Sequence, residues 1–132
     1  MARLARVREG FLVEEDARRL VLLHQGLREY ARALAIVERR VAARPGDARW
    51  RNDRGVLLML MGRTDEAVSS WDQAIALEPD FLAPYLSLGS LYASLNRRKE
   101  ALDLYQKALS RRRAKEEEGT FKRILAERKS LL

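Results

Sequence analysis

The chain has 132 residues, of which 47% are hydrophobic and 34% charged, with a net charge of +7, one histidine and no cysteine. This length suits one folded domain, and the balance of apolar and charged residues excludes a disordered tail. The absence of cysteine excludes disulfides and thiolate sites, and no apolar run approaches the roughly 20 residues that span a membrane.

Residues 1–13 form an arginine-rich segment with spaced apolar side chains. Leu4, Val7 and Phe11 could lie on one side of a short amphipathic helix that packs on the fold or on a partner. The basic start has the composition of a transit peptide, but Glu9 and the acidic residues that follow it argue against one. We therefore expect 1–13 to be a short helix or partly ordered.

The next hundred residues repeat with a period of 34. The copies are 14–47, 48–81 and 82–115. Small residues match small residues and aromatic residues match aromatic ones, in the pairs Gly55/Gly89, Ala67/Ala101, Trp71/Tyr105 and Ala74/Ala108. The first copy is weaker and keeps its register through Leu23/Leu57, Ala33/Ala67 and Pro45/Pro79. A period of this length predicts an array of stacked supersecondary units.

Each copy reads as two helices joined by a turn. In the third copy, apolar residues recur at spacings of three and four, first at Tyr85, Leu88, Tyr92 and Leu95 and then at Ala101, Leu104, Tyr105 and Ala108. Asn96 falls between these two stripes, and Gly62 falls at the same place in the second copy. The chain contains no alternating pattern typical of strands, so the fold class is all-α.

Several residues predict where helices begin and end. Thr64 is placed to cap the second helix of its copy, and the links 45–47 and 79–80 are placed to end one hairpin and cap the next. In the third copy Arg113 stands where the second copy has its proline, so we expect that copy's second helix to continue.

Residues 116–132 are predicted to form a C-terminal capping helix. Phe121, Ile124, Leu125 and Leu131 are spaced among charged residues, and Gly119–Thr120 would break the chain and cap this helix. Repeat stacks expose the apolar face of their last unit and need a terminal helix with a polar outer side.

These motifs resemble the tetratricopeptide repeat. Its pattern has a glycine in the first helix, then an alanine, an aromatic residue, a second alanine and a proline at the link. The second copy fits it with Gly55, Ala67, Trp71, Ala74 and Pro79. The first copy departs from it, with Val21 for the glycine and Arg40 for the second alanine. The resemblance implies a right-handed α-solenoid of three helix–turn–helix repeats.

In that family, one face of the first helices lines a groove that holds a peptide or helix. Ten residues here lie at such positions outside the predicted core: Arg18, Leu22, Gln25, Arg49, Asn52, Val56, Met59, Leu86, Ser90 and Ala93. Their apolar and small members have no role in the predicted core, which favours a groove. Helix packing, or cover by a terminal helix, is the alternative explanation.

The resemblance therefore implies a protein–protein interaction scaffold or adaptor. We expect its partner to be a peptide or helix with apolar and acidic residues. Family members that bind chaperones grip a C-terminal carboxylate with lysine, asparagine and arginine on this face. Only Arg18 suits that role here, whereas Leu22, Asp53, Ala83 and Ser87 do not. This chain does not look like such a cochaperone.

A basic patch supports a second hypothesis, binding to nucleic acid or to an anionic surface. The net charges of 1–47, 48–81 and 82–132 are +3, −2 and +6. The candidate patch is Arg111, Arg112, Arg113, Lys115, Lys122 and Arg123. Acidic residues 116–118 lie at helical pairing distance from Arg112 and Arg113, and aromatic residues for base stacking are not interleaved. Both features argue against nucleic acid as a partner. Self-assembly by end-to-end stacking is the third hypothesis.

Residues for catalysis are scarce. His24 aligns with Leu58 and Tyr92, so we expect it to be packed in the core, and no ligand set for a metal accompanies it. The chain also lacks a glycine-rich phosphate loop. We expect no enzyme activity, no metal and no cofactor, and a cytoplasmic protein without a membrane span.

Overall fold

The computed structural model describes residues 9–132, with side chains from residue 14 onward, so the expectations for 1–8 lie outside the described residues. The described part is all helical and contains no strand. Its elements are α2 (Glu9–Gly26), α3 (Tyr30–Ala43), α4 (Ala48–Leu60), α5 (Thr64–Leu77), α6 (Ala83–Ser94), α7 (Arg98–Leu109), the 3₁₀ turn η1 (Lys115–Glu117) and α8 (Glu118–Leu131). The predicted all-α fold is confirmed.

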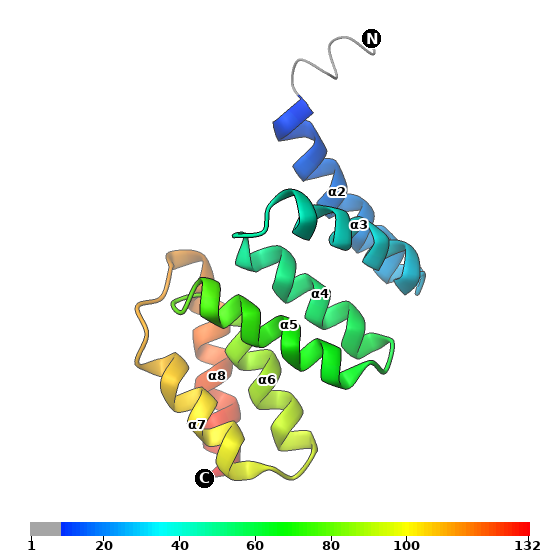
Figure 1. Cartoon of the computed structure of the whole chain (residues 1–132). Helices are drawn as coiled ribbons and strands as arrows, with labels where there is room; N and C mark the ends of the chain where they lie inside the picture. Colours follow the sequence, from blue (N-terminus) through cyan, green and yellow to red (C-terminus); the bar gives the residue numbers. More distant parts are fainter. Residues whose placement is uncertain (1–8) are drawn as a thin grey trace.

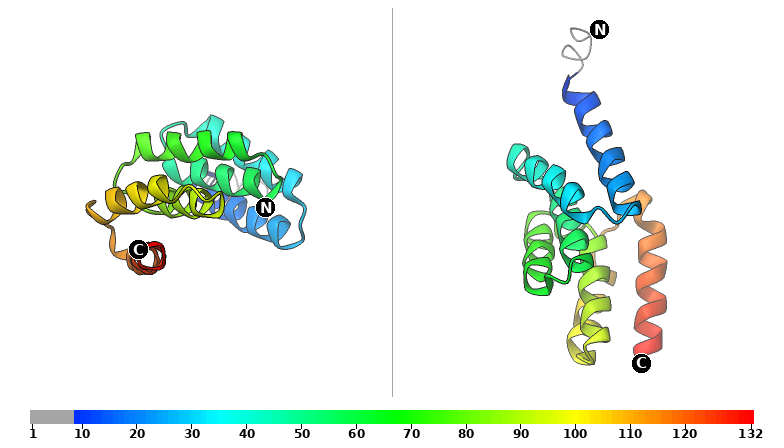
Figure 2. Two further views of the ribbon diagram at one scale, coloured as in Figure 1. Left: turned by 90° about the horizontal axis from the view of Figure 1, so that it is seen from below. Right: turned by 90° about the vertical axis from the view of Figure 1, so that its right-hand side faces the viewer.

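The helices form three consecutive hairpins in a two-layered stack. The first helices α2, α4 and α6 make one layer, and the second helices α3, α5 and α7 make the other (Figure 1). Each hairpin packs on the next, and α8 packs on both α6 and α7 (Figure 2). The α-solenoid expected from the 34-residue period is therefore present. α2 begins at Glu9, inside the segment 1–13 that the sequence sets apart.

The turn within each hairpin has the same geometry in all three copies. Arg28, Gly62 and Asn96 have positive φ angles of 61°, 77° and 60°. Just after each of them, a backbone N–H donates to the carbonyl five residues earlier: Glu29 to His24 at 2.7 Å, Arg63 to Leu58 at 2.8 Å and Arg97 to Tyr92 at 2.8 Å. This is the left-handed closure that ends many helices. The same backbone conformation therefore recurs every 34 residues, with the period of the sequence.

Two apolar clusters hold the stack together. The first gathers Val21 and Val37 from the first hairpin and Leu57 and Trp71 from the second, and it also includes Leu88 of α6. The second gathers side chains of the third hairpin and includes Ile124 of α8, which is fully buried. α8 therefore completes the core at the C-terminal end of the stack.

Three predicted helix boundaries are wrong. Thr64 is the first residue of α5 rather than its cap, and no side chain caps that helix. α7 ends at Leu109 instead of continuing, where the Ser110 hydroxyl donates to the carbonyl of Lys107. α8 already begins at Glu118, so Gly119 and Thr120 lie inside it.

The start of α6 is capped from a distance. Asp47 caps α4 as predicted, since its carboxylate accepts the N–H of Arg49 at 3.0 Å. Asp80 does not cap α6, because it accepts a hydrogen bond from Arg111 at 2.9 Å instead. The N–H groups of Leu82, which precedes α6, and of Ala83, its first residue, donate to the carboxylate of Glu117 at 2.8 and 3.1 Å.

Candidate functional site: the α4–α6 hollow

A hollow of about 360 Å³ opens between α4 and α6. It lies in the layer of first helices, where α2 and α8 stand further out than α4 and α6 and make this side of the stack concave (Figure 2). Val56, Met59, Leu60, Trp71, Ser87, Ser90, Leu91 and Ser94 line it. Its walls are mainly apolar, with three hydroxyl groups along α6.

Trp71 reaches this hollow from the other layer. It belongs to α5 and lies against Gly55 of α4, where a Cβ atom would overlap its indole ring. The indole Nε1 is buried and has no hydrogen-bond partner. The absence of a side chain at residue 55 therefore lets an aromatic ring from the second layer form part of the hollow's wall.

Three of the predicted groove residues meet in this hollow, namely Val56, Met59 and Ser90. All three are half-buried, so they can still contact a partner. The hydroxyl of Ser90 lies 3.4 Å from that of Tyr105. The hollow thus combines two apolar side chains of α4 with a hydroxyl on α6.

Leu86 and Ala93 lie elsewhere. Both pack against the C-terminal cluster that contains Ile124, and α6 is in contact with α8. For Leu86 and Ala93, the alternative to a groove, packing between helices, explains why these side chains are apolar or small. These two side chains support α8 and do not line the hollow.

The predicted residues of α2 lie beside α4. The Arg18 guanidinium binds the Asp53 carboxylate at 3.2 Å and stacks over the Trp50 ring at 4.6 Å from its centre. Burial raises the pKa of Asp53 to about 6, against the opposing effect of Arg18. Arg18 therefore already has an acidic partner within the chain. Leu22 is 63% exposed, and Gln25 is half-buried.

Asn52 lies on α4 one turn before Val56. It is buried, and its side-chain oxygen has no hydrogen-bond partner. A buried amide oxygen without a partner costs free energy. Asn52 does not line the α4–α6 hollow.

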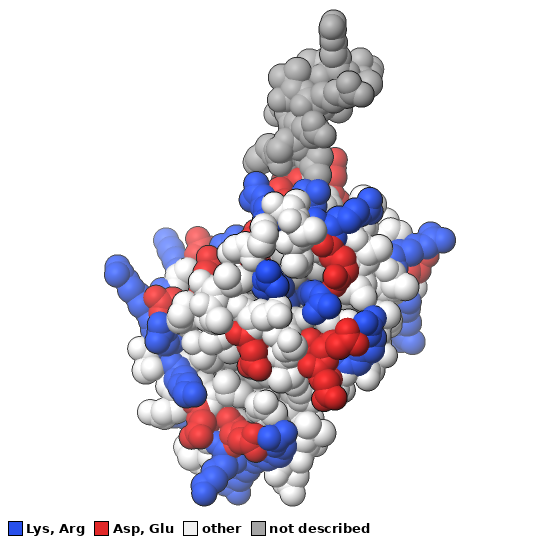
Figure 3. Space-filling view, in the orientation of Figure 1, with Lys and Arg blue, Asp and Glu red and all other residues white. Residues whose placement is uncertain are grey.

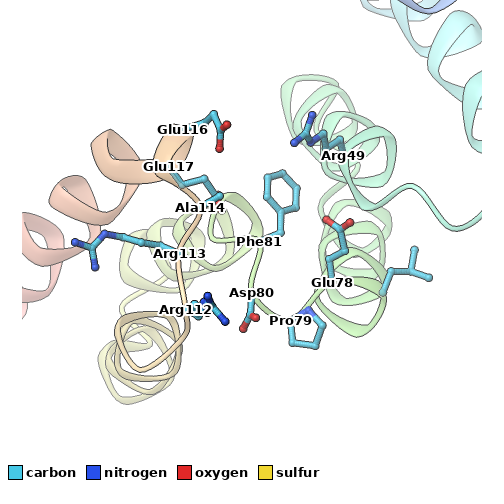
Figure 4. Close-up of a pocket in the computed structure, with 11 residues that line it drawn as sticks. Arg49, Glu78, Pro79, Asp80, Phe81, Arg112, Arg113, Ala114, Glu116 and Glu117 are labelled. Carbon is cyan, nitrogen blue, oxygen red and sulfur yellow. The ribbon is translucent and has the colours of Figure 1, made fainter.

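Arg49 lines a second hollow, of about 500 Å³, at the start of α4 and α6 (Figure 4). Its other walls are the loop from α5 to α6 and the linker from α7 to η1, with Phe81 projecting between Arg49 and Glu117 (Figure 4). Glu78, Asp80 and Glu116 also border it. Its charges are therefore mixed, and Arg49 is separate from the α4–α6 hollow.

The predicted basic patch is partly neutralised. Arg111 binds Asp80, and Arg113 binds Glu118 at 2.6 Å while stacking over Phe121. Of the acidic residues 116–118, Glu118 is therefore the partner of Arg113, whereas Glu117 accepts hydrogen bonds at the start of α6. Arg112 borders the second hollow, and Lys115, Lys122 and Arg123 are exposed.

On the side formed by α3, α5 and α7, acidic and basic side chains are interspersed (Figure 3).

Five residues that line the hollow are not among the predicted groove residues, namely Leu60, Trp71, Ser87, Leu91 and Ser94. The pairing of Gly55 with an aromatic residue in the same repeat is the signal that could have identified Trp71, because that glycine lets the ring approach the backbone of α4 and reach the wall of the hollow.

His24 is half-buried, as a packed residue would be, with its Nδ1 3.3 Å from the carboxylate of Glu29. Within the described residues, no three histidine, aspartate or glutamate side chains gather at a possible metal site. No helix in that part of the chain has the length and hydropathy needed to cross a membrane.

Comparison with known proteins identifies the repeat. Two family models, both described as tetratricopeptide repeat, match residues 20–81 and 57–117. A TPR repeat-containing thioredoxin of Arabidopsis thaliana, TTL4, is 32% identical over 72 residues, which are 54% of this chain and 11% of that protein. A second one from this plant, the inactive TTL3, is 29% identical over 72 residues. The chain spans about a tenth of the length of these relatives.

Solved structures share the arrangement of helices. The TPR2B domain of yeast Sti1, in a complex with pHsp70, superposes with a TM-score of 0.77 at 18% identity, over 91% of this chain and 96% of that one. The Yersinia enterocolitica secretion chaperone SycD, in complex with a peptide of the translocator YopD, superposes with a TM-score of 0.75 at 14% identity, over 89% and 90% of the two chains. At these identities the likeness concerns the fold alone.

Proposed function

We propose, from the premise that the chain belongs to the tetratricopeptide repeat family, that it binds a segment of another protein in the α4–α6 hollow. The observation that carries the proposal is the apolar wall of this hollow, to which α4 contributes the half-buried Val56 and Met59 and α5 contributes the ring of Trp71. Apolar side chains of the partner would enter this hollow, as is usual for peptide grooves. Two similar folds, in Sti1 and SycD, have been solved with bound partners.

The partner's polar requirements follow from the neighbours of the hollow. Ser87, Ser90 and Ser94 offer hydroxyl groups along α6. These groups suit the backbone of a bound peptide. An acidic residue of the partner would have to compete with Asp53 for Arg18 or reach Arg49 at the second hollow.

The test uses two variants that place a carboxylate in the hollow, Val56→Glu and Met59→Glu. Leu95→Glu is the matched control, because Leu95 is an exposed leucine at the end of α6 and outside the hollow. Partners captured from a lysate of the source cells should be lost from both hollow variants and retained by the control. Circular dichroism should show that all three variants are folded.

A captured partner's segment can then be titrated into the purified protein. Because Trp71 borders the hollow, its fluorescence should change on binding, whereas Trp50 is fully buried elsewhere. If the folded hollow variants bind the segment as tightly as the wild type does, the partner binds elsewhere and the proposal is wrong.

A further inference from the structure

The first helix of the stack exposes an apolar stripe. Asp16, Leu20, Leu23 and Leu27 recur at spacings of four, three and four, so they lie on one side of α2 and the turn that follows it. The leucines are 45%, 55% and 61% exposed. We call these four residues the α2 stripe.

The equivalent side is largely covered in α4 and at the first of these positions in α6, whereas Leu91 further along α6 is half-buried and Leu95 at its end is exposed. Thirty-four residues after Leu23, Leu57 is fully buried, and Leu88, which is equivalent to Leu20, is 1% exposed. Arg54 occupies the position between Leu20 and Leu88 and binds Glu38 of the preceding helix α3. This side therefore faces the second helix of the previous hairpin. No hairpin precedes α2 in the described part of the chain.

The last helix carries a second stripe. Lys122, Leu125, Lys129 and Leu132 recur at spacings of three, four and three and are all exposed. Ile124 is buried on the other side of α8, toward α6 and α7. We call the four exposed residues the α8 stripe. The two stripes lie on the first and last helices of the stack (Figure 1).

The two end helices have opposite charge. α2 carries four acidic and two basic residues, a net charge of −2, whereas α8 carries two acidic and four basic residues, a net charge of +2. Two copies of α2 would repel each other, and so would two copies of α8. The charges favour contact between α2 and α8, in which leucines meet leucines and Asp16 can approach a lysine.

We propose that copies of this chain associate end to end, with the α8 stripe of one copy packed on the α2 stripe of the next. The contact is heterologous, because it joins two different surfaces. Each copy in a pair still has one free stripe, so longer assemblies form as the concentration rises. The contact does not use the α4–α6 hollow, so it is independent of peptide binding.

The test uses one variant at each end, Leu23→Glu and Leu125→Glu, in the full chain. Both leucines are exposed, so folding should persist and can be checked by circular dichroism. Leu22→Glu is the matched control, because Leu22 is the exposed neighbour of Leu23 and lies outside the stripe. Sedimentation velocity at increasing concentration measures association.

The wild type and Leu22→Glu should associate, and added salt should weaken this association because opposite charges contribute to it. Each end variant alone should remain monomeric, with the dissociation constant raised at least about tenfold. A mixture of the two end variants should form a 1:1 dimer and nothing larger, because each supplies the stripe that the other has lost.

Two results would overturn the proposal. A wild-type protein that stays monomeric at every concentration has no such contact, as would follow if another part of the chain covered the α2 stripe. Association that survives Leu125→Glu but not Leu23→Glu would instead show a symmetric contact between two α2 helices, and the mixture would then form no heterodimer.

Discussion

The indole ring of Trp71 lies against the backbone of Gly55, in the space that a Cβ atom at residue 55 would need. Tyr105 lies in the same way against Gly89, one period later. In each hairpin a glycine in the first helix allows the ring of the second helix to approach its backbone. The 34-residue spacing of these pairs in the sequence is therefore a repeated packing contact.

Replacing either glycine by alanine should destabilise the protein. Alanine normally strengthens a helix, but at Gly55 or Gly89 the added methyl group overlaps the ring and forces the two helices apart. We expect the free energy of unfolding to fall by about 1–3 kcal/mol, as measured by urea denaturation. Gly119→Ala in α8 is the control, because a Cβ there meets nothing within 4 Å. It should stabilise the protein by up to about 1 kcal/mol, and a similar gain at Gly55 would contradict this account.

Glu117 should be important for the start of α6. Glu117→Ala leaves the N–H groups of Leu82 and Ala83 without their acceptor, so we expect a loss of about 1–2 kcal/mol in the free energy of unfolding. The neighbouring Glu116→Ala is the control, since Glu116 is exposed and lies at the edge of the second hollow. Equal stability of the two variants in the same denaturation experiment would show that this cap contributes nothing.

The role of Glu117 at the start of α6 could not be predicted from the sequence. Regular spacings in the sequence predict three features of the structure. Spacings of three and four residues predict the two helices of each copy, and the period of 34 predicts the repeat and its turns at Gly62 and Asn96. The cap on α6 comes from a residue 35 positions after Leu82 and outside the repeat pattern. Such a contact depends on the path of the linker after α7, which no local periodicity determines.

The candidate site was foreseen in part for the same reason. Val56 and Met59 could be identified because they lie on α4 with no role in the predicted core. Leu86 and Ala93 have the same pattern on α6, but they pack against the cluster that includes Ile124 of α8. A helical pattern shows which residues share a face, and it does not show which neighbouring helix covers that face.

Glu14 should be a stronger determinant of stability than the adjacent Glu15. The Glu14 carboxylate accepts hydrogen bonds from the indole of Trp50 at 3.0 Å and from Arg40 at 3.2 Å, so it joins α2 to α3 and α4. Removing it by Glu14→Ala leaves the buried indole N–H without a partner, and we expect a loss of about 1–3 kcal/mol. Among the described side chains, Glu15 pairs with Arg19 alone, on the surface of α2, so Glu15→Ala should cost less than about 0.5 kcal/mol. Thermal unfolding of both variants would compare them, and equal melting temperatures would refute the assignment.

Asp53 should make stability depend on pH between about 4 and 7. Burial raises the pKa of its carboxyl to about 6 in the folded protein, from 3.8 without that environment. Between these values the folded protein holds a proton that the unfolded chain has released. The contribution of Asp53 to stability is therefore largest below a pH of 3.8, and it is lost as the pH rises through about 6. The decline due to this group should amount to at most about 3 kcal/mol.

Asp53→Asn isolates this contribution, because the amide stays neutral at every pH and keeps nearly the same shape. Arg63 lowers the pKa of Glu66 and Arg113 lowers that of Glu118, so these two groups act in the opposite direction, whereas burial raises the pKa of Asp72 and of Glu117. All four groups remain in the variant. The difference in unfolding free energy between wild type and variant should therefore shift against the wild type as the pH rises from about 4 to 7. Urea denaturation at a series of pH values measures this difference. A difference that stays constant over the whole range would mean that Asp53 ionises in the folded protein as it does in the unfolded chain, with Arg18 fully compensating its burial.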